Sequence, residues 1–278
     1  MWKAELQEIW SNILTWIAVS VGTVLSTLAF VFDLVGKTQR TKVLIPEHLT
    51  MLFRSGLGDL TLLLFLTVLA ALPAAASWSY EKKAGSAALM LSRTSRGRLF
   101  GIKAVSTAVS AFLISAFPFL LNYLFCLIAI GRDGWVLVDY AGAESVYSSL
   151  FDQSIRRGLA QMLFPSLYLN RPAVNMLLHI LLVGIYGSGA AVLTFSLSLF
   201  FRLTPFQTLV LPTVAVLVIE MLLSAFDKGA WIAADLLRLS SPSVGTESGV
   251  VLVVSLIVPF LISSILLWLK TRVFRDEL

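Results

Sequence analysis

Very few residues of this chain have the types and spacing that catalysis requires. In the segment GIYGSGA at 184–190, glycines flank Ser188, and His179 precedes it in the same apolar run. A serine nucleophile must lie within hydrogen-bond reach of its base. The two are nine positions apart, which at about 100° per residue places their side chains on opposite faces of a helix. The small residues of this segment therefore favour close helix packing over catalysis.

Nucleotide and metal chemistry find no support either. GKT at 36–38 has the end of a phosphate-binding loop, but Val31 occupies the position of the required earlier glycine. Cys126 is the only cysteine, and His48 and His179 each stand alone. We therefore expect no catalytic residue, no metal site and no cofactor bound by this chain itself.

Glu220 is the one clear acid deep in a long apolar run. A carboxylate inside a membrane is costly and is by default a candidate for function. It could meet a cationic substrate on a transport path, or it could stay protonated and hydrogen-bond to a neighbouring helix. The residues alone leave both alternatives open.

Composition shows what kind of solvent surrounds these residues. The chain of 278 residues is 58% hydrophobic and only 13% charged, whereas soluble domains have about 25% charged residues. A net charge of +5 would suit nucleic acid, but the basic residues are scattered between apolar runs and form no stripe. We expect an all-α integral membrane protein that contacts membrane lipids and binds no nucleic acid.

The apolar runs predict six spanning helices, because a span needs about 20 mostly apolar residues and the bilayer tolerates no unpaired backbone. Four prolines fall inside these runs and are expected to kink helices, not to end them: Pro73, Pro118, Pro212 and Pro259. The predicted spans are 12–33, 60–79, 104–130, 173–201, 206–226 and 249–269.

Charge predicts the orientation of these spans. With the N-terminus inside, the inner parts hold 11 Lys and Arg and the much longer outer parts hold 10. This bias fits the positive-inside rule and places both termini in the cytoplasm. The chain then forms one membrane domain over 1–278, with extracytoplasmic segments at 131–172 and 227–248.

The first residues predict an amphipathic helix over 1–11 that lies in the membrane interface. Its apolar face repeats with helical spacing, and tryptophans stand at headgroup depth. The other face would hold the polar residues Lys3, Glu5, Gln7 and Glu8, followed by Asn12. A plain cytoplasmic extension of the first span is the alternative interpretation.

A compact basic turn separates the second and third predicted spans. Residues 78–105 carry six Lys and Arg against a single acid, Glu81. Within it, SAALMLSRTS contains good helix formers and an apolar side. A short helix at the end of two membrane helices could dock on a soluble partner and pass motion into the membrane. An ordinary positive-inside loop is the alternative.

The order of residues in this turn resembles the first cytoplasmic loop of permease subunits of type-2, exporter-type ABC transporters. That loop has the form Glu-x-Glu-x-Gly-Thr, then leucines, a proline, a Ser-Arg pair and a later lysine. Here Lys83 replaces the second Glu and Arg93 stands in place of the proline. The positions that match, and that the resemblance assigns to ATPase coupling, are Glu81, Gly85, Leu89, Leu91, Ser95, Arg96 and Lys103.

The layout of the chain is similar to that family as well. The family has six spans with both ends inside, preceded by an amphipathic helix that often contains Lys-x-Glu-Leu. Lys3, Glu5 and Leu6 keep this spacing. The segment 227–248 resembles the family's outer re-entrant pieces, and 80–103 corresponds to the coupling loop.

The resemblance implies a permease that is not itself an enzyme, in a bacterial-type plasma (inner) membrane. Two copies of a separate ATPase subunit would bind ATP and Mg, and a second permease copy, most simply in a homodimer, would complete the exporter. The cargo would be lipophilic or amphipathic, such as a drug, a peptide antibiotic or a lipid-like molecule. The alternatives are an intramembrane enzyme and a passive channel or scaffold.

Overall fold

A computed structural model describes most of the chain and shows it to be all-helical. Throughout the described residues the regular structure is helical and contains no strand. Five of the helices are long and apolar enough to cross a membrane, as in a multi-pass membrane protein. The described residues are 2–38, 50–52, 65–72, 92, 94–130, 163–201, 205–226, 232–239 and 248–272.

Among the described residues, six helices form the body of the bundle and two short ones lie near one end. The long helices and α1 are α1 (Trp2–Ser11), α2 (Ile13–Thr38), α6 (Arg96–Ile130), α9 (Pro172–Phe200), α10 (Pro205–Ala225) and α12 (Ser248–Arg272). The short ones are α8 (Pro165–Asn170) and α11 (Ala233–Leu237).

The five candidate spans agree with five of the six predicted ones. They are Ile13–Phe32, Arg96–Ala129, Ala173–Phe200, Phe206–Leu223 and Ser248–Arg272. Most of the predicted span 60–79 lies outside the described residues, although 65–72 is helical. The third span is longer than predicted, because α6 begins at Arg96 and not near 104.

Proline interrupts none of the long helices in which it is described. Pro118 lies inside α6 and Pro259 inside α12, and Pro212 lies within the bounds of α10. This confirms the prediction that these prolines do not end their helices. Pro73 falls outside the described residues.

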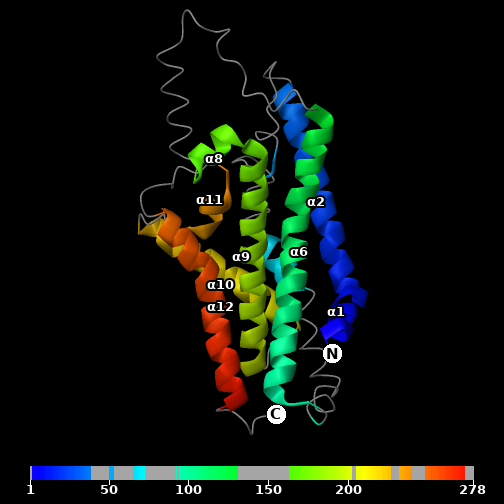
Figure 1. Ribbon diagram of the computed structural model, residues 1–278, viewed down its shortest axis with the longest axis vertical. Helices are drawn as coiled ribbons and strands as arrows, with labels where there is room; N and C mark the ends of the chain where they lie inside the picture. Colours follow the sequence, from blue (N-terminus) through cyan, green and yellow to red (C-terminus); the bar gives the residue numbers. More distant parts are fainter. Residues whose placement is uncertain are drawn as a thin grey trace, which may run out of the picture.

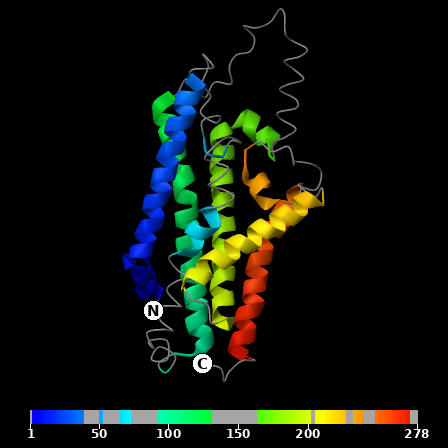
Figure 2. The ribbon, with the colours of Figure 1, turned by 180° about the vertical axis from the view of Figure 1, so that it is seen from behind.

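Helices α6 and α9 form the centre of the bundle and share its most extensive helix contact. Helix α2 packs on the other side of α6, and α12 packs against α9 (Figure 1). Helix α10 crosses the other helices obliquely, on the side that faces the viewer in Figure 2. Helix α1, the start of α6 and the ends of α9 and α12 all lie at one end of the bundle (Figure 1). We call it the α1 end.

Small residues let these helices approach closely, as predicted for the GIYGSGA segment. A Cβ added at Gly184 would lie 2.7 Å from the Phe112 ring of α6, and one at Gly187 would collide with Ser115. Across the α2–α6 contact, a Cβ added at Gly22 would lie 2.8 Å from Pro118. Helix α9 therefore uses its glycines for packing, as membrane helices commonly do.

Buried polar contacts hold the opposite end together. Asn122 is fully buried in α6; its Oδ1 accepts the backbone N–H of Met51 at 2.9 Å, and its Nδ2 donates to the Ser26 carbonyl at 3.2 Å. His179 of α9 lies 2.9 Å, through Nδ1, from the Leu237 carbonyl at the end of α11. Because buried polar groups are costly unless paired, these contacts fix α11 and residues 50–52 on the spanning helices.

Candidate functional site

The structure brings together two residues that are far apart in the sequence at the α1 end of the bundle. The Lys103 ammonium of α6 donates to the Glu5 carboxylate of α1 at 2.8 Å. Only 4% of the Lys103 side chain and 11% of the Glu5 side chain are exposed. A buried charge is tolerated only when it is paired, so this ion pair fixes α1 against α6.

The position of Glu5 corrects the predicted helical wheel. We expected Glu5 on the polar face with Lys3, Gln7 and Glu8. Those three are exposed, but Glu5 is buried together with Ile9. The prediction was wrong because it sorted residues by polarity alone, whereas the partner that stabilises Glu5 lies 98 residues further along the chain.

Helix α1 is distinct from α2 but firmly joined to it. Asn12 stands between them, and its Oδ1 accepts the Leu14 N–H at 2.9 Å, which caps the start of α2. The Trp16 indole N–H donates to the Trp10 carbonyl at 3.0 Å, and the two rings meet edge to face at 6.5 Å. These contacts fix the end of α1 to the start of α2.

Three of the seven predicted coupling residues lie in the described part of the chain. Ser95 directly precedes α6, and its carbonyl accepts the Leu99 N–H at 3.0 Å. Arg96 is half-buried at the first position of α6, and Lys103 follows two turns later. At about 100° per residue, Arg96 and Lys103 share one face of α6. The other predicted coupling residues lie outside the described residues: Glu81, Gly85, Leu89 and Leu91.

The predicted loop boundary at 103 therefore does not coincide with a helix boundary. Residues 96–103 form the first two turns of α6, continuous with the third span. Arg96 and Lys103 therefore belong to the same helix as the third span.

A second buried lysine lies at the same end, which the sequence analysis missed. Lys270 in the last turn of α12 is 4% exposed, and its ammonium lies 5.5 Å from the centre of the Phe200 ring at the end of α9. A cation over an aromatic face is attracted by the ring. This contact ties the cytoplasmic ends predicted for α9 and α12 to each other.

Glu220 lies in α10 and is half-buried, while its neighbours Ile219 and Met221 are exposed. Helix α10 packs against α9. Both alternatives for Glu220, a substrate contact and a structural bond between helices, stay predictions.

Hydrolytic and metal chemistry gain no support among the residues that can be placed. The Nδ1 atom of His179 binds the Leu237 carbonyl, and its ring packs edge to face on Phe164 at 6.0 Å between centroids. Ser188 is nearly buried nine residues further along α9. Among the described residues no group of three or more His, Cys, Asp or Glu side chains could hold a metal ion.

Asn122 is a buried polar residue with two hydrogen bonds to other segments, and the sequence analysis overlooked it. Its position inside the predicted span 104–130 was a visible signal, since polar side chains in spans usually bond between helices.

Comparison with models of protein families, with curated proteins and with solved structures finds no match to this chain.

Proposed function

We propose that this chain is the membrane-spanning permease subunit of an ATP-driven exporter of the type-2 ABC class, powered by a separate ATPase. The proposal starts from the resemblance of the basic turn and of the first residues to that family. The observation that carries it is the ion pair between Glu5 and Lys103. Each of these residues occupies a position that the resemblance had picked out independently.

The ion pair supports a coupling role because it joins the two parts on which an ATPase would act. The basic turn leads directly into α6 through Ser95 and Arg96. Lys103 then connects α6 to α1, and the Trp10–Trp16 contact connects α1 to α2. A push on the turn would move α6, α1 and the first span together.

Six spans with both termini in the cytoplasm are part of the same proposal. Helices α2 and α6 both begin at the α1 end (Figure 1). The chain must therefore return across the bundle between residues 38 and 96, and the predicted span 60–79 is the apolar run available for this return. The basic turn and the last turn of α12 would then face the cytoplasm, in keeping with the positive-inside rule.

The surface of α10 and α12 supports assembly with a second permease copy. Both helices carry long rows of exposed apolar residues, such as Val214, Ile219 and Met221 on α10. Such surfaces suit lipid or another apolar helix. The gap between two copies would carry a lipophilic or amphipathic cargo in a bacterial-type plasma membrane.

The proposal is tested by ATPase activity that depends on Arg96. The tagged chain is purified from its native membrane in mild detergent, returned to liposomes and assayed for ATP hydrolysis. We expect hydrolysis with the native chain and a large loss with Arg96→Glu. The matched control is Arg272→Glu, because Arg272 is an exposed arginine at the same end of the bundle.

The result has a clear failing outcome. Preparations of the native chain without ATP hydrolysis would contradict the proposal. Equal hydrolysis with Arg96→Glu and with the native chain would contradict the coupling role of the turn. Transport is then measured separately from hydrolysis, as ATP-dependent movement of a lipophilic dye across the membrane of the same liposomes.

A further inference from the structure

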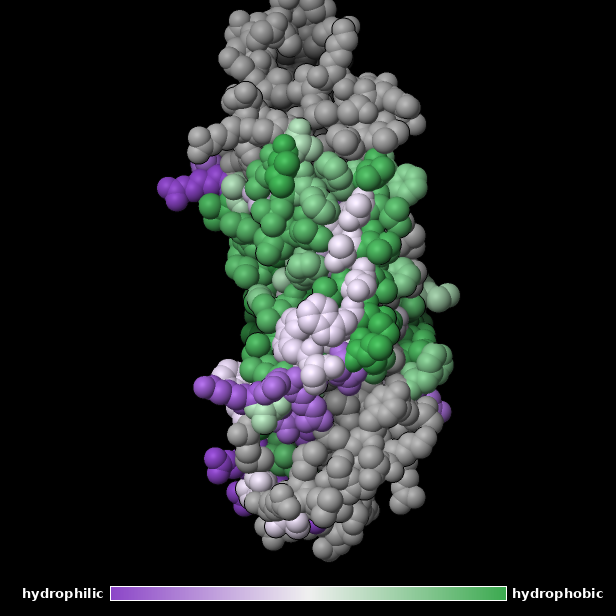
Figure 3. Space-filling model, turned by 90° about the vertical axis from the view of Figure 1, so that its right-hand side faces the viewer, coloured by the Kyte–Doolittle hydropathy of each residue, from purple (hydrophilic) through white to green (hydrophobic). Residues whose placement is uncertain are grey.

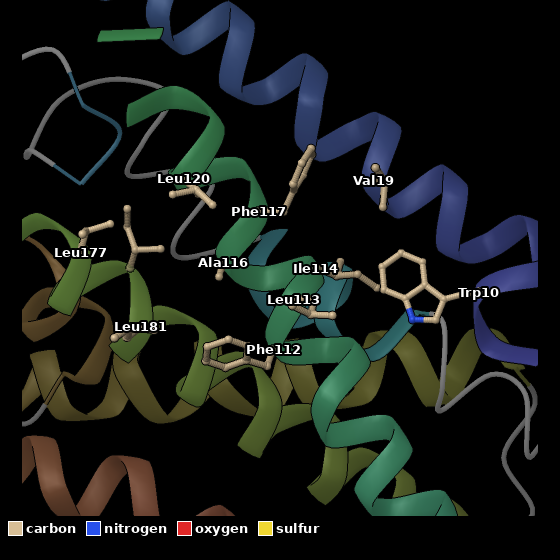
Figure 4. A pocket seen from close by; sticks show the side chains of 11 residues that line it. Trp10, Val19, Phe112, Leu113, Ile114, Ala116, Phe117, Leu120, Leu177 and Leu181 are labelled. Atoms are coloured by element: carbon tan, nitrogen blue, oxygen red, sulfur yellow. The ribbon is translucent and has the colours of Figure 1, made fainter. Parts of the chain in front are cut away.

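An apolar groove runs along the face where α6 lies between α2 and α9. Its volume is about 580 Å³, within the range of about 300–1,000 Å³ that small-molecule sites occupy. Trp10 and Val19 line one side, and Leu177 and Leu181 of α9 line the other (Figure 4). Leu113 of α6 lies between these walls (Figure 4) and is 47% exposed.

Towards the α1 end, the groove continues as a stripe of exposed residues on α6. Val105 and Val109 are exposed, and Leu113 follows them into the groove. Arg98 is exposed on the same stripe, because at about 100° per residue all four lie within about 80° around the helix. Arg98 makes no ion pair to any residue that the structure describes.

The spacing along this stripe matches one leaflet of a bilayer. Arg98 and Leu113 are 15 residues apart, which is about 22 Å at the helical rise. Half a bilayer with its headgroup region is about 20–22 Å thick. With Arg98 at the phosphate level, Leu113 and the groove lie near the bilayer midplane.

The surface shows the same division. A band of hydrophobic residues covers the middle of the molecule, and hydrophilic residues gather below it towards the α1 end (Figure 3). An exposed arginine at such a boundary attracts anionic headgroups. Trp10, on the groove wall, supplies a rigid aromatic surface against which a chain can pack.

We propose that this groove is a binding site for an anionic phospholipid of the leaflet at the α1 end. The phosphate lies on the Arg98 guanidinium, one acyl chain follows Val105 and Val109, and its end occupies the groove between Trp10 and Leu181. The bound lipid fills the groove between α2, α6 and α9 and so takes part in the packing of these three helices. This inference goes beyond the proposed function and needs no ATPase to be tested.

The test counts lipids retained by the purified chain. The protein is placed in nanodiscs of equal parts dioleoyl-phosphatidylglycerol and dioleoyl-phosphatidylcholine, extracted in mild detergent and analysed by native mass spectrometry. We expect the anionic lipid to be preferred. Arg98→Gln should lower that preference about fivefold, as expected for one basic residue at a membrane surface, and Arg98→Lys should keep it.

A second pair of variants tests the groove. Leu113→Trp should fill it and lower retention of both lipids, whereas Leu261→Trp, at an exposed position of α12, should leave retention unchanged. Leu177→Trp on the α9 wall repeats the test if the first variant does not fold, as judged by its melting temperature and elution profile. All of these positions are exposed, so the fold should tolerate them.

Three results would overturn the inference. Equal retention of the two lipids by the native chain removes the headgroup site, as does an undiminished preference in Arg98→Gln. Equal losses in Leu113→Trp and Leu261→Trp show general lipid contact and no groove site. Dissociation of protein dimers by Leu113→Trp with unchanged lipid retention assigns the groove to a second copy of the chain.

Discussion

Breaking the Glu5–Lys103 ion pair should destabilise the protein far more than removing an exposed acid from the same helix. At 2.8 Å between the ammonium and the carboxylate, two unit charges attract by about 6 kcal/mol at an effective dielectric constant of about 20. Desolvation of both groups offsets most of this attraction. The penalty of leaving one charge buried without its partner is what a single substitution measures, and it is about 3–5 kcal/mol.

Glu5→Gln and Lys103→Met should therefore each lower the free energy of unfolding by about 3–5 kcal/mol. The double variant leaves no unpaired charge and should cost clearly less than the sum of the two single changes. Glu8→Gln is the matched control, because Glu8 is an exposed acid on α1, and its effect should stay within about 0.5 kcal/mol.

The assay is unfolding in mixed micelles with increasing dodecyl sulfate, followed by tryptophan fluorescence. Trp10 belongs to α1 and Trp16 to α2, so loss of their ring contact reports the release of α1. Strictly additive costs in the double variant, or a Glu5→Gln effect no larger than that of Glu8→Gln, would refute the ion pair as the contact that fixes α1. The coupling path proposed through Lys103 would then lose its physical basis.

Three other contacts lead to predictions of the same kind. Asn122→Leu should cost about 1–3 kcal/mol in the same unfolding assay, because it leaves the Met51 N–H buried without an acceptor; a neutral result would refute that bond. Gly187→Ala should destabilise because its Cβ meets Ser115, whereas Gly97→Ala meets nothing within 4 Å and should gain up to about 1 kcal/mol; equal effects would contradict the close packing. His179→Ala should speed amide exchange in α11 roughly fivefold through loss of one hydrogen bond, and unchanged exchange in residues 233–237 would show that α11 is held by other contacts.

Hydropathy alone predicted the positions of the long helices well. The bilayer imposes a simple rule, since each span needs a long apolar run and must satisfy its own backbone. The bounds of α9, α10 and α12 accordingly lie within a few residues of the predicted spans. The prolines were also placed correctly, because proline in a membrane helix is tolerated.

The same rule could not find where α6 begins. Residues 96–103 contain Arg96, Arg98 and Lys103 and so fall outside the apolar run 104–130 from which the third span was predicted, yet they continue the helix. The available signal was Ser95, a residue type that favours the position before a helix. Hydropathy predicts where a segment leaves the lipid. It does not predict where the helix itself ends, because that depends on capping and packing.

Contacts between residues far apart in the chain were the main feature of the site that could not be predicted from the sequence. The polarity of Glu5 argued for water, but burial with Lys103 depends on α1 turning towards α6, which no local pattern encodes. The resemblance had singled out both residues, Glu5 within a Lys-x-Glu-Leu pattern and Lys103 as a coupling residue, but it did not pair them. In the proposed function the ion pair gives that assignment a physical content: a lysine held by a buried partner would pass motion from α6 to α1, whereas an exposed lysine would not. If the basic turn takes up the motion of an ATPase, the rigid path from Arg96 through Lys103 to Glu5 is the one along which charge-preserving changes should matter least and charge-removing changes most.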